Sequence, residues 1–132
     1  MYSRSVIPVT DAASSARTVL VADDSPVVRA AVAKAVRTAG FTVLEAASLE
    51  EARAVDARAL FAAVLDLDLG DGTGIDAARA LSLAQPSLRF AFFTGGDDPP
   101  LTARARELAP VFIKPRELDR VLAWLNGLLT AD

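Results

Sequence analysis

Short apolar runs recur along this chain from residue 18 onward, and each is followed by a stretch with helical features. The runs VLVA at 19–22, AAVL at 62–65 and FAFF at 90–93 are continuously apolar and do not alternate with polar residues. Such runs are typical of parallel strands that helices cover on both faces, because both sides of each strand are then buried. We therefore predict an α/β domain in which strands and helices alternate.

Helix start and stop signals divide the chain into five strand–helix units. Ser25 before Pro26 is typical of a helix start, Gly40 of a helix end, and Ser48 with Glu51 of a capping box. The predicted strands are residues 18–23, 41–45, 62–66, 88–93 and 111–113, and the predicted helices are residues 26–39, 48–57, 74–84, 101–108 and 116–129. Residues 97–100 are expected to form a turn. We expect one domain over residues 18–132, preceded by a flexible, Ser- and Ala-rich N-terminal arm over residues 1–17.

Composition excludes several classes of function. The 132 residues include no Cys and no His, which rules out thiol catalysis, Ser-His catalysis and His-ligated zinc. The net charge of −3, without a long basic run, argues against direct nucleic-acid binding. No apolar stretch is long enough to predict a membrane span, and the N-terminus lacks a signal-peptide core, so we expect a cytoplasmic protein.

Acidic residues stand directly after two of the apolar runs. Asp23 and Asp24 follow residues 19–22, and Asp66 follows residues 62–65. In open α/β sheets ligands bind outside the carboxyl ends of the strands, so we expect the three carboxylates to converge there. Three anions in one place repel one another unless a cation holds them together. An all-oxygen ligand set points to Mg²⁺.

Thr94 and Lys114 occupy equivalent places after the next two strands. Each residue also has an ordinary interpretation: Thr94 could be a hydroxyl that caps the turn after its strand, and Lys114 could be a surface lysine. However, Pro115 restricts Lys114 to an extended backbone, which would aim its side chain toward the predicted crevice. A cation and a hydroxyl beside carboxylates suit a phosphoryl group. Gly95 leaves that site open, and its N–H could bind a phosphoryl oxygen; it could equally be a turn glycine.

On these residues the chain resembles the response-regulator receiver domain, the CheY-like family. The resemblance covers residues 18–129 and rests on VLVADDSP at 19–26, VLDLDLGDGTG at 64–74, FFTG at 92–95 and FIKP at 112–115. It implies a flavodoxin-like, doubly wound (βα)5 fold with strand order 2-1-3-4-5. Gly70 stands where the family usually has proline, Val111 stands where it often has an aromatic switch residue, and a short spacing predicts a short helix between Thr94 and Lys114.

The resemblance also implies roles for the site residues. Asp66 would accept a phosphoryl group from the phosphohistidine of a histidine kinase or histidine phosphotransfer protein, with Mg²⁺-dependent self-phosphorylation and autodephosphorylation instead of enzymatic turnover. Asp24 and Asp66 would bind Mg²⁺ directly, Asp23 would bind it through water, and Asp68 through its backbone carbonyl. Thr94 and Lys114 would contact the phosphoryl oxygens.

The family's usual output face comprises the fourth helix, fifth strand and fifth helix. Trp124 lies at the edge of the apolar face of the last predicted helix, with Arg104, Arg106, Arg116 and Arg120 on what is expected to be the same side. Trp124 could be a boundary core residue, or a contact with an unknown output protein or a second copy in a dimer.

Two other functions remain open on the sequence. Asp66-Leu67-Asp68, Thr94 and Lys114 also fit a haloacid dehalogenase-type phosphatase, although that motif belongs on the first strand of its fold. The second alternative is a pseudo-receiver, which binds partners without being phosphorylated. A receiver domain that is part of a longer kinase or regulator would also have the same sequence signals. The interpretation that we favour is a stand-alone receiver that signals through protein–protein interaction.

Overall fold

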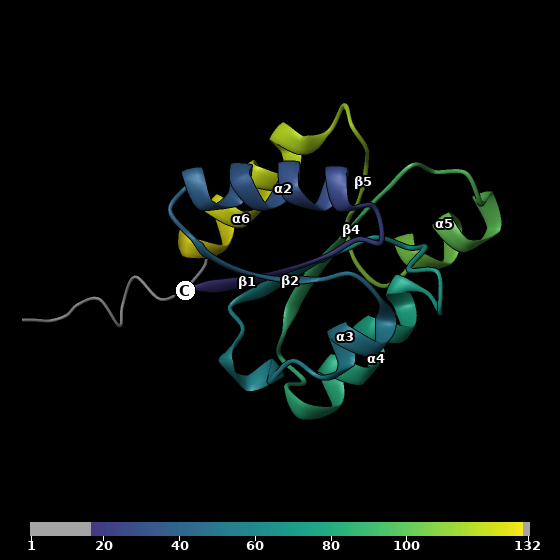
Figure 1. The fold of residues 1–132 in the computed structure, drawn as a ribbon, viewed down its shortest axis with the longest axis horizontal. Coiled ribbons are helices and arrows are strands. Elements are labelled where there is room, and N and C mark those ends of the chain that lie inside the picture. Colours follow the sequence, from purple (N-terminus) through teal and green to yellow (C-terminus); the bar gives the residue numbers. More distant parts are fainter. Residues whose placement is uncertain (1–16, 131–132) are drawn as a thin grey trace, which may run out of the picture.

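Five parallel strands form one sheet in a computed structural model that describes residues 17–130 (Figure 1). The predicted arm lies outside the described residues, except for its last residue, Arg17. The strands are β1 (Thr18–Ala22), β2 (Thr42–Ala46), β3 (Ala62–Leu65), β4 (Arg89–Thr94) and β5 (Val111–Ile113). Their order, β2-β1-β3-β4-β5, confirms the predicted flavodoxin-like topology.

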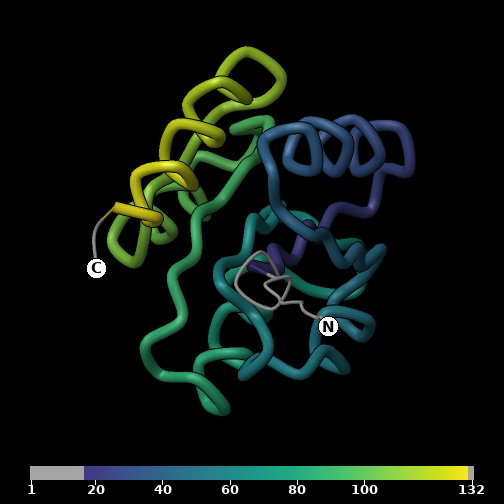
Figure 2. Tube along the Cα trace, turned by 90° about the vertical axis from the view of Figure 1, so that its left-hand side faces the viewer, coloured from purple at the N-terminus to yellow at the C-terminus, as the bar shows by residue number. Residues whose placement is uncertain are grey.

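Helices cover both faces of this sheet. On one face lie α2 (Pro26–Thr38) and α6 (Leu118–Thr130), which Figure 2 shows side by side. On the other lie α3 (Leu49–Arg53), α4 (Gly74–Ala84) and α5 (Pro99–Arg106). Each layer has its own apolar cluster, because the strands point alternate side chains to opposite faces. None of the described helices is long and apolar enough to cross a bilayer.

The second predicted helix, over residues 48–57, is wrong in its extent. The observed α3 ends at Arg53, and the chain turns before a short 3₁₀ helix, η2 (Ala57–Ala59). The cause is Asp56, whose side chain accepts a hydrogen bond from the N–H of Arg58 and so caps a new turn in place of continuing the helix.

The prediction of a turn over residues 97–100 is also wrong. The Asp98 side chain accepts a hydrogen bond from the N–H of Leu101 and caps α5, which therefore begins at Pro99. The two prolines fit the first helical turn because that turn needs no backbone donor. The resulting helix is short, as the spacing between Thr94 and Lys114 predicts, although it lies two residues earlier than expected.

The start of the last helix differs in the same way. It begins at Leu118, not at residue 116, because residues 114–117 form a turn. The Glu117 carboxylate accepts a hydrogen bond from the N–H of Ile113, 2.7 Å away, which ties this turn to the end of β5. The strand ends differ from the predicted ones by at most one residue.

Candidate functional site

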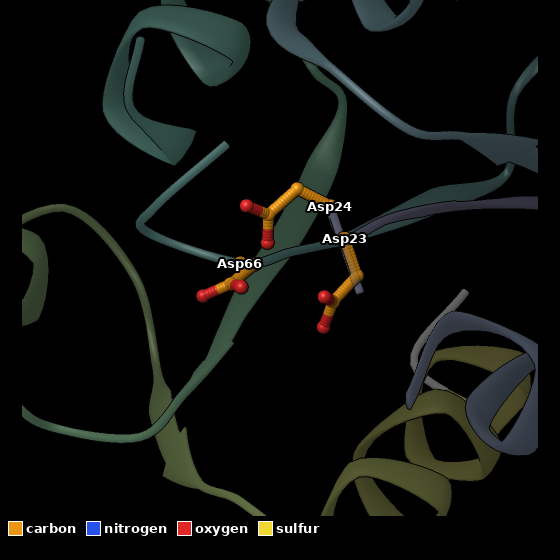
Figure 3. A group of neighbouring side chains, drawn as sticks. All are labelled: Asp23, Asp24 and Asp66. Carbon is orange, nitrogen blue, oxygen red and sulfur yellow. The ribbon is translucent and has the colours of Figure 1, made fainter. Parts of the chain in front are cut away.

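The three carboxylates lie together at the carboxyl edge of the sheet. β1 and β3 are neighbours with Ala22 opposite Leu65, so the residues that follow them emerge side by side. Asp23, Asp24 and Asp66 each place an oxygen within 4.8 Å of the others. Figure 3 shows the three side chains next to one another. Asp23 and Asp66 are buried, with 3% and 5% of their surface exposed, whereas Asp24 is exposed. The predicted convergence of the carboxylates is confirmed.

Lys114 brings the positive charge to this cluster. Its Nζ atom lies 2.8 Å from Asp23 Oδ2 and 2.8 Å from Asp66 Oδ2. The backbone N–H of Lys114 donates to the carbonyl of Thr94, which fixes the end of β5 against β4. The lysine side chain thus points toward the crevice, as the position before Pro115 predicts; the Lys114–Pro115 peptide bond is cis.

The charges in this cluster are not balanced. Burial raises the pKa of Asp66, and the hydrogen bond and charge of Lys114 only partly offset that increase. The negative charge of Asp23 raises the pKa of Asp66 further. Burial alone would lower the pKa of Lys114, but the hydrogen bonds that its ammonium group donates to Asp23 and Asp66, with the charges of these carboxylates, outweigh it, so the pKa of Lys114 is raised. One ammonium group therefore serves two buried carboxylates, and an additional cation would relieve the remaining repulsion.

The loop after β3 is folded around the acceptor candidate. Asp66 Oδ1 accepts a hydrogen bond from the N–H of Asp68 at 3.3 Å, and Asp68 Oδ1 accepts one from the N–H of Gly70 at 3.0 Å. Gly70 has φ +83°, which proline cannot adopt, so this backbone explains the absence of the family's usual proline. Gly74 begins α4 directly against the Asp66 carbonyl oxygen, where a Cβ atom would lie 2.3 Å away.

These residues open into a cleft of about 420 Å³. Asp24, Asp66, Asp68, Thr94, Gly95 and Lys114 all line it, so the structure brings together most of the predicted site residues. Asp23 does not line the cleft; it is buried behind the Lys114 ammonium group. Thr94 is buried at the end of β4, and Gly95 lies where a Cβ atom would come within 2.9 Å of the Asp97 carboxylate.

Several residues of the site were missed on the sequence. Thr73, Asp97, Asp98, Leu101 and Thr102 also line the cleft. The signal for the α5 side was present, since an acidic residue before two prolines is typical of a capped helix start. The hydroxyl of Thr102 is buried without a hydrogen-bond partner among the described residues.

Arg29 was also missed. It donates a hydrogen bond to the Asp23 carbonyl at 2.9 Å and pairs with Glu45 at the end of β2, 3.2 Å away. It thereby fixes the backbone of the acidic pair. Its distance along the chain from both partners leaves no local sequence signal.

The donor set fits a hard divalent cation. The convergent groups are carboxylate oxygens, the ligands that Mg²⁺ prefers, and one of the three, Asp24, is exposed and accessible from the cleft. Burial, and to a smaller extent the charge of Asp23, raises the pKa of Asp66, so a bound cation would favour its charged form. The chain has no Cys or His, so its metal ligands cannot include sulfur of Cys or nitrogen of His.

The model of the response regulator receiver domain family matches residues 19–125. The chain belongs to this family. No curated protein has significant sequence similarity to the chain. Among solved structures, the fold is similar to that of the Vibrio cholerae chemotaxis protein CheY4, with 23% identity, a TM-score of 0.74 and coverage of 86% of this chain and 98% of that one.

Two other solved structures are similar at slightly higher identity. The non-phosphorylated receiver domain of HemR from Leptospira biflexa shares 25% identity and a TM-score of 0.76, covering 88% of this chain and 96% of that one. A response regulator from Burkholderia pseudomallei, solved with a phosphorylated aspartic acid and a calcium ion, shares 26% identity and a TM-score of 0.67 over 83% of this chain and 66% of that one. Receiver domains are generally phosphoacceptor modules of two-component signalling, so this chain is a receiver of that class.

Proposed function

We propose that this receiver accepts a phosphoryl group on Asp66 from the phosphohistidine of a histidine kinase or histidine phosphotransfer protein. The observation that carries the proposal is the contact of Lys114 Nζ with Asp66 Oδ2, inside an acidic cleft that Thr94 also lines. A fixed cation thereby lies next to the Asp66 carboxyl group. The Burkholderia pseudomallei structure, which contains a phosphorylated aspartic acid, gives a related fold in which this modification occurs.

In the proposed reaction an Asp66 carboxylate oxygen attacks the phosphorus atom. A P–O bond forms, the P–N bond of the phosphohistidine breaks, and its electron pair leaves on the imidazole nitrogen. Lys114 supplies a positive charge that would stabilise the phosphoryl oxygens, and Thr94 and the Gly95 N–H would donate hydrogen bonds to them. Thr94 ends β4, Gly95 follows it, and Lys114 follows β5, so all three residues line the cleft.

We assign Mg²⁺ to Asp24 and Asp66, with Asp23 acting through water and Asp68 through its backbone carbonyl. When bound, the ion would neutralise negative charge on the phosphoryl group and the carboxylates. Asp24 offers an exposed carboxylate at the cleft, whereas the buried Asp23 carboxylate is already engaged by Lys114 and by the N–H of Ser25 at 2.9 Å. That difference in exposure supports a direct role for Asp24 and an indirect one for Asp23.

We place the protein in the cytoplasm, where it would signal through contacts with other proteins and not through nucleic acid or a membrane.

For the expected output face, formed by α5, β5 and α6, we propose self-association involving Trp124. This residue is half-buried and packs against the apolar cluster between the sheet, α2 and α6, which leaves part of the indole for a partner. Arg104, Arg106, Arg116 and Arg120 are all exposed on α5 or near the start of α6. Unchanged sedimentation of phosphorylated Trp124→Ala would rule out this contact.

The experiment that tests the function is incubation with acetyl phosphate and Mg²⁺, followed by intact mass and peptide mapping. We expect one phosphoryl group on Asp66, lost in Asp66→Asn and in the absence of Mg²⁺. No modification would favour the pseudo-receiver. Many turnovers of a generic phosphate ester per protein molecule would favour a phosphatase.

A further inference from the structure

A second hollow lies away from the phosphoryl cleft, between α3 and α4. It is an open groove with a volume of about 800 Å³, lined by apolar and basic side chains together with Asp76 and Ser82. Leu49 forms part of its floor, and Leu83 stands at its edge with 87% of its surface exposed, the most exposed large apolar side chain among the described residues. A single exposed leucine is ordinary, but one that borders a groove with a second leucine in it is typical of a contact surface.

The charges around this groove are mostly positive. Arg53 and Arg79 are exposed, and neither forms an ion pair within residues 17–130. The acidic group in the lining, Asp76, accepts hydrogen bonds from the N–H and the hydroxyl of Thr73, so it is engaged in the capping box of α4. The groove therefore offers an apolar floor between two exposed guanidinium groups without ion-pair partners, although the charge of Arg53 also acts on the nearby Asp71 carboxylate.

We propose that the groove between α3 and α4 binds an acidic amphipathic helix of a partner protein. Leucines at the floor and edge would take the apolar face of that helix, and the two arginines would pair with flanking carboxylates, since arginine binds carboxylates through two parallel hydrogen bonds. The charge of the groove selects this partner over a basic helix or a second copy of this chain, whose matching face is itself basic.

The groove is joined by direct contacts to the loop of residues 66–74, which contains the proposed acceptor and is called the acceptor loop below. Asp71 Oδ1 accepts a hydrogen bond from the N–H of Leu49 at 2.7 Å, and Asp71 Oδ2 accepts one from the N–H of Glu50 at 3.0 Å. Gly72 lies so close that a Cβ atom there would be 2.3 Å from Leu49 Cδ2. The start of α3, and with it one wall of the groove, thus rests on the same loop that contains the acceptor.

A short chain of hydrogen bonds completes the connection to Asp66. The N–H of Asp68 donates to Asp66 Oδ1, and the N–H of Gly70, next to Asp71, donates to Asp68 Oδ1. This step rests on the proposed function: in an acyl phosphate the Asp66 carboxylate becomes a neutral acyl group and the negative charge lies on the phosphoryl oxygens, so the hydrogen bond from the N–H of Asp68 to the acyl oxygen loses its charge assistance. A change in the loop would reach α3 through Asp71, and we infer that phosphorylation changes the affinity of the groove for its helix.

The test begins with a display library of randomised helical peptides, selected against the whole chain. We expect the enriched peptides to be net acidic, with apolar residues at helical spacing. Affinity is then measured by fluorescence anisotropy with one enriched peptide. Arg79→Glu should lower the affinity about tenfold or more and Leu83→Ser severalfold, because the first reverses a charge and the second removes an exposed anchor.

Lys34→Glu on α2 is the control, since Lys34 is also an exposed cation, forms no ion pair within the described residues and lies on the opposite face of the sheet from the groove. It should leave the affinity unchanged. Enrichment of basic peptides, equal affinity of Arg79→Glu and wild type, or self-association of the chain that Leu83→Ser abolishes would each overturn the proposed partner.

A final arm measures the same affinity after treatment with acetyl phosphate and Mg²⁺, with the phosphate on Asp66 quantified by mass in the same sample. We expect a changed affinity in the wild type and none in Asp71→Ala that carries the same phosphate. Phosphorylated wild type with unchanged affinity would overturn the coupling. A wild type that takes up no phosphate would instead overturn the proposed function, and the docking surface would then be judged by the Arg79→Glu comparison alone.

Discussion

The two loops that border the cleft around Asp66 are held very differently. The acceptor loop, residues 66–74, is tied at both ends by Leu69 N–H to Gly72 and by Gly74 N–H to Leu67, besides the carboxylate bonds of Asp66 and Asp68. The opposite loop, residues 95–98, has a single side-chain tie among the described residues, from Leu101 N–H to Asp98. The first loop is a connected unit, and the second is a short linker into α5.

The same contrast extends to what lies behind each loop. The acceptor loop caps α3 through Asp71. Behind the opposite loop stands Val111, which is 8% exposed and belongs to the apolar core, where the family often has an aromatic switch residue. A valine has few conformers and little area to move in or out of the surface. A structural change at Asp66 can therefore reach α3 through direct hydrogen bonds, whereas its connection to α5 is weaker.

Lys114 is the bridge between the two sides, and its removal should have the largest effect. Lys114→Met leaves two buried carboxylates without a counter-ion, which should destabilise the fold by about 3 kcal/mol in metal-free buffer. Urea unfolding measures this change. Arg120→Met is the control, because it breaks an exposed pair with Glu117 and should change little. Equal effects of the two variants would mean that the cluster is not electrostatically strained.

Mg²⁺ should act on the acceptor side alone. At a free concentration ten times the dissociation constant, it should stabilise the wild type by about 1.4 kcal/mol, as any ligand of the folded state does. Asp24→Asn should abolish this stabilisation in thermal unfolding experiments. Asp97→Asn removes an exposed carboxylate that lines the same cleft on the opposite side. This variant should still be stabilised by Mg²⁺. Loss of the Mg²⁺-dependent stabilisation in both variants would indicate general screening of negative charge and not binding at a specific site.

Helix caps offer a matched pair across the cleft. Asp71→Ala and Asp98→Ala each remove the carboxylate that caps a short helix, α3 or α5, and each should lower the melting temperature by a few degrees. Hydrogen exchange at Leu49 and Glu50 should respond to beryllofluoride with Mg²⁺ in Asp98→Ala and not in Asp71→Ala. A response that survives in Asp71→Ala would break the proposed route from the acceptor loop to α3.

The pH dependence of Asp66 should be the smallest effect. Because the pKa of Asp66 is raised in the folded state, its contribution to stability is complete below the unfolded value of 3.8 and is lost as the pH rises through the folded pKa. In metal-free buffer, Asp66→Asn should therefore be more stable than wild type at neutral pH, and the difference should vanish at acidic pH. A neutral-pH loss of stability in Asp66→Asn would contradict the sign of this shift.

Much of the site could be predicted because strand ends are visible in the sequence. Continuous apolar runs located β1, β3, β4 and β5, and in a parallel sheet their carboxyl ends must meet, which placed Asp66 and Lys114 together. The start of α5 was also readable in Asp98 and its two prolines, although the turn interpretation overlooked it. These features depend on residues close together in the chain.

What escaped prediction depends on distant residues. The Asp71 carboxylate caps α3 from 22 positions away along the chain, and no local pattern shows such a bond. The Arg29 contact with the Asp23 carbonyl and the exposed setting of Leu83 likewise follow from how α2 and α4 pack. The groove between α3 and α4 became visible only when these elements were placed in space.

The central claim is that Asp66 is the phosphoryl acceptor, and its most direct test is peptide mapping after treatment with acetyl phosphate. With Mg²⁺ present, the account predicts one phosphoryl group on the peptide that contains Asp66, and none in Asp66→Asn. Wild type that stays unmodified, or a phosphoryl group that persists in Asp66→Asn, would contradict it.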